Sequence, residues 1–458
     1  MSSELWVWMN GQQVGVWSQS RNKVSVFQYT ATWAQSPSSR ALSLSLPLTA
    51  GNAEIRGPVV ENYFDNLLPD SQPIRERIRQ RFRTPSTQAF ELLTAIGRDC
   101  VGAVQLLPPG IAPTGWDQVN SEPMTTAQVA AQLRSASTSM PMGQRIDNAQ
   151  DFRISIAGAQ EKTALLRFGG RWRRPLGSTP TTHILKLPLG LVGNMRADMH
   201  DSVENEWLCS KLLRALGFNV ANTDMHMFED QKALVVERFD RRWQNTPAGA
   251  HNKRGFVPGP DTWIARLPQE DFCQIAGVAS GQKYEVDGGP GIRDGLGYLA
   301  GSQDANADRS SFILAQLAFW LLAATDGHAK NFSVFLERGT TYRMTPLYDV
   351  LSAWPIIGKG ANMLAAQDVK LAMAVHAKNA HYKLGDIRVR HWRSLAQTSG
   401  VDGLWEQMLA LVHRVNQAFG TVEAQLPAGF PAPVWDTVRA GTRKHASQFL
   451  REAQIPQS

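Results

Sequence analysis

The stretch TDGHAKN, residues 325–331, is followed by the segment TPLYD, residues 345–349. Between them lie two short runs rich in aromatic and β-branched residues, 332–337 and 341–346, separated by RGT at 338–340. This pattern predicts a β-hairpin with a short, glycine-containing loop. Because a hairpin returns the chain to its starting point, we expect Asp326, Asn331 and Asp349 to lie together at its open end.

The spacing of these three residues indicates phosphoryl transfer. An Asp five residues before an Asn, with a second Asp further along, is the order in which protein kinases present a catalytic base and two metal ligands. We therefore interpret Asp326 as the base and Asn331 and Asp349 as ligands of Mg²⁺, which favours carboxylate and amide oxygens. The alternative is a polar loop with unrelated Asp and Asn residues, which the combination of all three with a hairpin disfavours.

Two further residues of this region are candidates for nucleotide binding. His328 lies in the same loop, where it could contact nucleotide or make only local hydrogen bonds, and Tyr348 directly precedes Asp349. The run before the loop, residues 312–324, is apolar nearly all round and predicts a buried helix that ends at TDG. With 13 residues and an internal Gln, it is too short to cross a bilayer.

The bulk composition describes an ordinary globular chain. It has 458 residues, of which 43% are hydrophobic and 19% charged, and 47 basic against 40 acidic residues give a net charge of +7. That charge admits an anionic partner without requiring one. Three scattered cysteines without a CxxC pair indicate neither a disulfide framework nor a zinc site. We expect a cytoplasmic protein, since the N-terminus lacks an export signal.

The pattern of runs along the chain predicts an α+β protein in three parts. Residues 1–150 begin with alternating apolar runs around AsnGly at 10–11, which predict a β-rich subdomain with an early hairpin. Residues 151–262 mix strands with a helix over 203–216, and residues 263–458 become predominantly helical. The Gly-, Pro- and Asn-rich residues 244–261 would join the last two parts.

The middle part contains the candidates for holding a nucleotide. Gly158, between two β-like segments, could let backbone N–H groups approach phosphates, although the segment is not a Walker A loop and one such Gly is more often structural. Lys186 interrupts the apolar run HILKLP (183–188), so it must reach solvent, as a snorkelling edge residue would, or a buried anion such as phosphate. Glu204 or Glu206 could hold Lys186 in place, although surface solvation is the simpler expectation for both.

Several strings together resemble the HipA family of toxin kinases, in the order in which that family carries them. They are SIAGAQEKTALL, HILKLP, ERFDRR, LPQEDFC, YEVDGGPGI, TDGHAKNFS, TPLYD and KLAM. The resemblance covers most of residues 150–375, and the YEVDGGPGI block (284–292) has no generic meaning. The first 150 residues are similar to the family in length and in their β-rich start.

The resemblance implies an ATP- and Mg²⁺-dependent serine/threonine protein kinase with two lobes, a mixed, β-rich N-terminal part and an all-helical C-terminal part. It assigns Asp326 as the catalytic residue, Asn331 and Asp349 as metal ligands, and Lys186 as the lysine on the nucleotide phosphates. Ser155 corresponds to an autophosphorylated serine that silences the kinase. The remaining nucleotide contacts would be the phosphate loop, Ala157, Gly158, Ala159, Gln160, Glu161 and Lys162, and the adenine hinge, Glu237, Arg238 and Phe239.

The same resemblance implies partners. A small helix-turn-helix antitoxin similar to HipB would neutralise the toxin and hold it on operator DNA, and the family target is glutamyl-tRNA synthetase. The basic segment 388–393 is the best candidate for a phosphate backbone, but a solvated helix face is the simpler interpretation. Two other functions stay open from the residues alone: a small-molecule phosphotransferase, and a catalytically idle component bound to antitoxin and DNA.

Overall fold

In the computed structural model, an antiparallel hairpin at the N-terminus confirms the early hairpin predicted around AsnGly at 10–11. Strands β1 (Ser3–Met9) and β2 (Gln12–Gln19) pair directly. Asn10 and Gly11 join them with φ of 44° and 79°. Two successive positive φ values are typical of the tight turn whose twist matches the flanking strands, and AsnGly adopts it at low cost.

The structure describes residues 3–20, 22–137, 160–193, 196–246, 251–252, 255–256, 259 and 261–454. The chain forms two compact units. The first comprises Met1–Leu187, His226–Gly281 and Ser333–Tyr342, and the second comprises Pro188–Met225, Gln282–Phe332 and Arg343–Ser458. These units therefore differ from the three consecutive parts expected from sequence, since each is assembled from separate stretches of chain.

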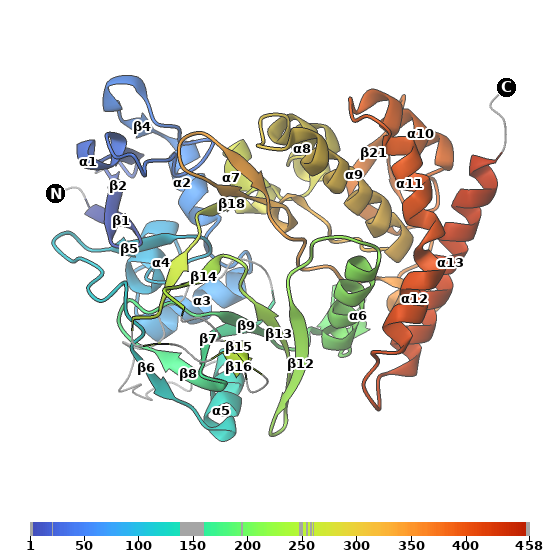
Figure 1. Cartoon of the computed structure of the whole chain (residues 1–458), viewed down its shortest axis with the longest axis horizontal. Helices are drawn as coiled ribbons and strands as arrows, with labels where there is room; N and C mark the ends of the chain where they lie inside the picture. Colours follow the sequence, from blue (N-terminus) through green and yellow to red (C-terminus); the bar gives the residue numbers. More distant parts are fainter. Residues whose placement is uncertain are drawn as a thin grey trace. The chain divides into compact units, whose positions relative to one another are not determined.

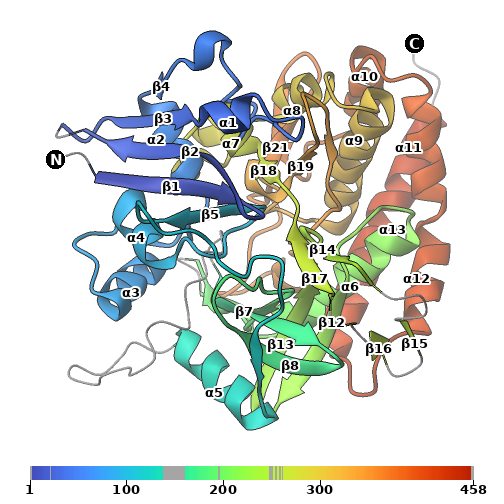
Figure 2. The ribbon, with the colours of Figure 1, turned by 60° about the vertical axis from the view of Figure 1, so that its left-hand side comes forward.

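A five-stranded sheet opens the first unit, in the order β4-β3-β2-β1-β5, and Figure 2 shows β3, β2, β1 and β5 as successive strands. Helices α2 and α4 contribute to its core, where the rings of Trp17 and Phe64 stack with centroids 4.0 Å apart. The elements are β3 (Ser25–Tyr29), α1 (Ala31–Ala34), β4 (Ile55–Arg56), α2 (Pro58–Asp65), α3 (Gln72–Phe82), α4 (Ala89–Ile96) and β5 (Val104–Leu107).

A six-stranded sheet follows in the order β12-β13-β9-β7-β8-β6. Helix α5 (Thr126–Ser137) packs on one face of it through Val129, Ala130 and Leu133, against Leu165, Leu185 and Val235 of the sheet. The strands are β6 (Ser121–Pro123), β7 (Lys162–Phe168), β8 (Arg171–Pro175), β9 (His183–Lys186), β12 (Thr223–Phe228) and β13 (Gln231–Glu237).

Short strands and one helix complete the first unit, except that β20 begins in the first unit and ends in the second. They are β14 (Arg241–Gln244), β15 (His251–Asn252), β16 (Gly255–Phe256), β17 (Trp263–Arg266), β18 (Gln269–Asp271), α7 (Phe272–Ala276), β19 (Ser333–Leu336) and β20 (Tyr342–Met344). Strand β19 lies between β18 and β20 in a three-stranded sheet. The hairpin predicted after TDGHAKN is therefore present as β19 and β20.

Helices dominate the second unit, and Figure 1 shows α9, α11 and α13 side by side. The C-terminal part predicted over residues 263–458 is predominantly helical, and the short antiparallel pair β21–β22 also lies within it. The elements are β10 (Gly190–Val192), β11 (Ala197–Met199), α6 (Ser202–Ala215), α8 (Ile292–Leu299), α9 (Ala305–Leu322), β21 (Lys370–His376), β22 (Ala380–Lys383), α10 (Val389–Thr398), α11 (Leu404–His413), α12 (Val415–Glu423) and α13 (Ala432–Ala453).

Helix α9 is the buried helix that the apolar run predicted. It ends slightly before the predicted TDG, because Ala323 adopts a left-handed conformation with φ of 49° and Ala324 N–H donates back to Phe319 O at 2.8 Å. Within the described residues, no helix has the length and apolarity needed to cross a membrane. Cys100, Cys209 and Cys273 are all buried thiols outside any disulfide.

A buried network of three arginines and two aspartates holds the first unit together. Asp99 is paired with Arg238, Arg241 and Arg266 at 3.4, 2.9 and 3.2 Å, and Asp240 is paired with Arg238 and Arg241 at 2.8 and 3.1 Å. All five side chains are at most 8% exposed. The network joins the chain just after α4 to the start of β14 and to the end of β17.

A second buried carboxyl, that of Glu270 on β18, is held by neutral donors. Its oxygens accept hydrogen bonds from Ser43 Oγ and from Leu44 N–H, the latter at 2.8 Å. Burial raises the pKa of Glu270 to about 8. A carboxyl with a raised pKa in the folded state stabilises the fold fully below its unfolded pKa, and that contribution is lost as the pH rises through the folded value.

We therefore expect Glu270→Gln to flatten the pH dependence of stability. Between pH 6 and pH 9 the wild-type chain should lose roughly 2–3 kcal/mol more unfolding free energy than the variant, because an amide stays neutral. Urea unfolding at both pH values measures the difference, with Glu122→Gln, at an exposed position, as the matched control. An equal loss in wild type and Glu270→Gln would contradict the assignment of a neutral buried carboxyl.

Candidate functional site

The loop after α9 brings the predicted residues of the TDGHAKN stretch together with Asp349. Asn331 is 4% exposed, and its Nδ2 donates to Asp326 O at 2.8 Å and to Asp349 O at 3.2 Å. These bonds tie both ends of the β19–β20 segment to one point. Asp326, by contrast, presents a side chain that is 62% exposed. A buried amide thus places two aspartates beside each other, one of them open to solvent.

The orientation of Asn331 also decides which of its atoms can bind a cation. Because Nδ2 is used by two backbone carbonyls, Oδ1 is the atom that can act as a ligand. Asp349 supplies a carboxylate and has φ of 60°, a left-handed conformation that a non-glycine residue adopts only when its surroundings hold it there. An amide oxygen and a carboxylate oxygen at neighbouring positions suit Mg²⁺ together with phosphate and water oxygens.

Local packing explains the shape of the loop. A Cβ atom at Gly327 would lie 2.4 Å from the Phe319 ring, so the backbone can pack on α9 only with glycine there. His328 is 5% exposed, and its Nε2 lies 3.9 Å from Asp326 Oδ2. The hydroxyl of Tyr348 donates to Lys330 O at 2.8 Å. Both candidates for nucleotide contact therefore have structural roles within the loop.

Sequence reasoning missed one residue of this site. The Tyr284 hydroxyl donates to Asp326 Oδ1 at 2.5 Å, and the Tyr284 ring lies edge-on to His328 with centroids 5.1 Å apart. Tyr284 is the first residue of the YEVDGGPGI block, which the sequence identifies only as a feature of the family. The one sign of a role was a tyrosine at the start of a glycine-rich block, and its spacing in the chain does not connect it to residue 326.

In the first unit, the strand register places the two predicted lysines side by side. Lys162 on β7 faces Lys186 on β9, and Lys186 is 6% exposed. Residues directly opposite each other in a sheet share a face. Leu185 packs on the α5 side, so the lysines lie on the other face, which they share with Ala164, Ile184 and Val236. That face combines two cations with an apolar floor, as a nucleotide requires.

Only some of the predicted phosphate-loop residues lie within the part of the chain that the structure describes. Gln160 Nε2 donates to Leu187 O at 2.5 Å, and Glu161 forms an ion pair with Arg77 of α3. These side chains thus fix the start of β7 beside the end of β9. The other predicted phosphate-loop residues, Ala157, Gly158 and Ala159, lie outside the described residues, as does Ser155.

The predicted adenine hinge follows β13. The Arg238 side chain is bonded within the buried network. Its backbone N–H donates to Thr182 O at 2.9 Å, and its carbonyl accepts from Arg241 N at 3.3 Å. Arg238 is therefore bonded within this unit through both its side chain and its backbone, and its contact with adenine stays a prediction. Glu237 is exposed, and Phe239 packs edge-on against Phe335 with centroids 5.8 Å apart.

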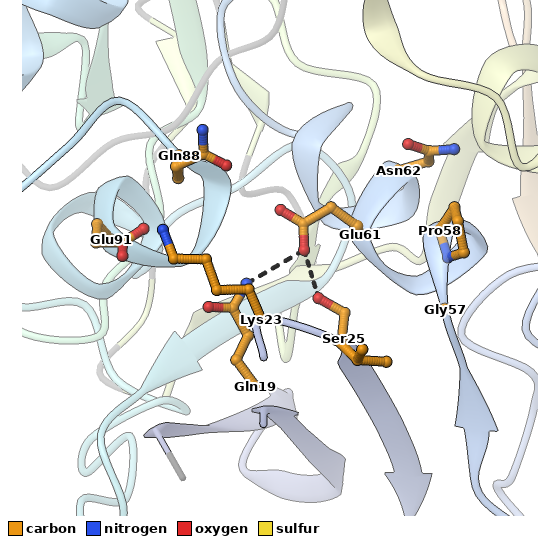
Figure 3. A pocket seen from close by; sticks show the side chains of 10 residues that line it. Gln19, Lys23, Ser25, Gly57, Pro58, Glu61, Asn62, Gln88 and Glu91 are labelled. Atoms are coloured by element: carbon orange, nitrogen blue, oxygen red, sulfur yellow. Dashed lines mark hydrogen bonds between the residues drawn. The ribbon is translucent and has the colours of Figure 1, made fainter. Parts of the chain in front are cut away.

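Two further features lie outside the arrangement described so far. Glu204 and Glu206, expected to be solvated, are 9% and 3% exposed on α6. A pocket of about 390 Å³ opens between β2, β3 and the starts of α2 and α4. Figure 3 shows its Glu61 accepting hydrogen bonds from Ser25 and Gln19. None of the predicted site residues lines this pocket.

Comparison with known proteins covers nearly the whole chain. The family model described as the HipA-like C-terminal domain matches residues 154–423, and the HipA N-terminal domain matches residues 5–107. The putative kinase Y4mE of Sinorhizobium fredii is 29% identical over 423 residues, 91% of this chain and 90% of the relative. The serine/threonine-protein kinase toxin HipA of Shewanella oneidensis is 28% identical over 358 residues, 76% of this chain and 72% of that protein.

A solved structure shows the same fold. It is the complex of HipA, HipB and operator DNA from the toxin–antitoxin system of Shewanella oneidensis MR-1, matched with a TM-score of 0.76 at 23% identity. The match covers 99% of this chain and 100% of that chain. The α+β architecture predicted from sequence is thereby confirmed.

Proposed function

The chain belongs to the HipA family, and on that premise we propose that it is an ATP- and Mg²⁺-dependent serine/threonine protein kinase that acts as the toxin of a toxin–antitoxin module. The observation that carries the proposal is the buried Asn331 amide, which holds the exposed Asp326 beside the strained Asp349. A loop that merely connects a helix to a hairpin would not require a buried amide bonded to both aspartate backbones.

In this proposal each residue of the loop has a chemical role. Asp326 accepts the proton of the acceptor hydroxyl, while Asn331 and Asp349 hold the metal ion through oxygens. A bound divalent cation would neutralise charge that develops on the phosphates. His328 and Tyr348 keep the loop in shape. Positioning and charge stabilisation are the main contributions that a protein makes to phosphoryl transfer.

The nucleotide would be held by the first unit. Lys186, with Lys162 beside it, binds the phosphates as a cation on an otherwise apolar face, and Ala164, Ile184 and Val236 supply a surface for the adenine. Glu237 and Phe239 follow this face at the end of β13. The segment Ala157–Ala159 completes the phosphate loop in this scheme.

The HipB-like antitoxin and the operator DNA are proposed from the solved complex, and the other partners from the resemblance to the HipA family. The protein substrate would be a translation factor, with glutamyl-tRNA synthetase as the first candidate. A HipB-like helix-turn-helix antitoxin would neutralise the kinase and attach it to operator DNA. Autophosphorylation at Ser155 would silence the enzyme, since about two negative charges beside a loop that binds phosphates oppose nucleotide binding.

The test is intact-mass spectrometry of the purified chain after incubation with ATP and Mg²⁺. We expect the mass of one phosphate, which is absent without the metal and absent in Ser155→Ala. Ser178→Ala, a serine change in the same unit, serves as the matched control and should keep the phosphate. Transfer to small molecules but to no protein would contradict the proposal, and so would the absence of any ATP-dependent transfer.

A further inference from the structure

The carboxylate of Asp326 is not left to rotate freely in solvent. Its side chain is 62% exposed, yet Oδ1 accepts the 2.5 Å hydrogen bond from the Tyr284 hydroxyl. An exposed Asp on a loop ordinarily exchanges among rotamers, and a bond to one oxygen selects a single rotamer. The other oxygen, Oδ2, lies on the side of His328 Nε2 at 3.9 Å. The two oxygens therefore have different surroundings.

The tyrosine that makes this bond is itself firmly anchored. Lys283 O accepts from Ala329 N at 3.1 Å, which joins the segment before Tyr284 to the loop of Asp326. Just after Tyr284, Glu285 accepts from Ala374 N at 2.6 Å and is hydrogen-bonded to His376 Nε2 at 2.7 Å, both on β21. The residues before and after Tyr284 are thus both held by hydrogen bonds, and Tyr284 belongs to the same unit as Asp326.

We propose that Tyr284 is a positioning residue, which holds Asp326 Oδ1 so that Oδ2 faces the acceptor hydroxyl. The inference rests on the proposed kinase function. In the transfer step the acceptor oxygen forms a bond to the γ-phosphorus while its proton passes to Oδ2. The bond from the γ-phosphorus to the β–γ bridging oxygen breaks, and ADP leaves. Tyr284 keeps its proton and stays bonded to Oδ1 throughout.

The test compares Tyr284→Phe with wild type in phosphoryl transfer from labelled ATP to a protein acceptor. We expect kcat to fall about tenfold, the size expected for loss of a hydrogen bond to a charged group. KM for ATP should stay within about twofold, because no step of nucleotide binding uses the hydroxyl. Tyr382→Phe on β22, the same chemical change elsewhere in this unit, should leave both constants unchanged.

A double-mutant cycle separates positioning from general loosening of the fold. Since Tyr284 acts through Asp326, adding Tyr284→Phe to Asp326→Asn should cause no further loss, whereas independent effects would multiply. Unchanged or raised kcat in Tyr284→Phe would overturn the inference, as would phosphate found on Tyr284 of the wild-type chain, which would make its hydroxyl an acceptor. An inactive wild-type chain would instead overturn the proposed function.

Discussion

Replacing Asp326 with Asn is expected to lower kcat for phosphoryl transfer by about 10²–10⁴-fold, the usual contribution of a positioned general base. The amide has the same shape as the carboxylate and can still accept the Tyr284 hydrogen bond through its oxygen. It cannot accept the proton of the acceptor hydroxyl. Initial rates with labelled ATP and a protein acceptor measure the effect, and the same variant should relieve any growth arrest caused by the wild-type chain.

Two controls give this result its meaning. Asp402→Asn, at an exposed position before α11 in the same unit, removes the same charge and should leave kcat unchanged. The melting temperature of Asp326→Asn should match that of wild type, because the side chain is mostly exposed. If Asp326→Asn kept more than about half of the wild-type kcat, Asp326 would not be the base.

Local sequence patterns were sufficient to predict that Asn331 and Asp349 lie close to this aspartate. The run of apolar residues specified α9, and the two β-rich runs specified the hairpin of β19 and β20. Their chain order then required residues 326, 331 and 349 to meet. The left-handed conformation of Asp349 could not be predicted in the same way, since its cost is met by surrounding contacts rather than by a glycine at that position.

Contacts between distant parts of the chain were the ones that the sequence did not predict. Arg238 was expected to contact adenine, yet its partner Asp99 lies 139 residues earlier, in a segment that sequence analysis assigned to a different domain. Likewise, β18 pairs with β19 although one precedes and the other follows the helices α8 and α9. A buried guanidinium needs its counter-charge from whichever segment lies beside it, and periodicity contains no information on that partner.

Replacing Asp99 with Ala should produce the largest loss of stability, about 3–5 kcal/mol of unfolding free energy. The variant leaves Arg238 and Arg241 buried with Asp240 as their carboxylate partner, and it removes the carboxylate that is paired with the buried Arg266. Burial alone would raise the pKa of Asp99, but the three guanidinium groups hold that pKa well below its usual range. A depressed pKa means that the stabilisation is present above the unfolded value and is lost only in acid, so the deficit should be constant from pH 6 to pH 9.

Chemical denaturation of the variant beside Asp117→Ala, an exposed aspartate in the same unit, measures the deficit. A loss below about 1 kcal/mol would mean that the arginines reach solvent or other partners when Asp99 is removed.

The Asp99→Ala variant also tests whether the network matters for nucleotide binding. Arg238 lies between Glu237 and Phe239, and its guanidinium is fixed by Asp99 and Asp240. In the fraction of Asp99→Ala that remains folded, we therefore expect KM for ATP to rise while kcat changes little, because Asp326 and its loop belong to the other unit.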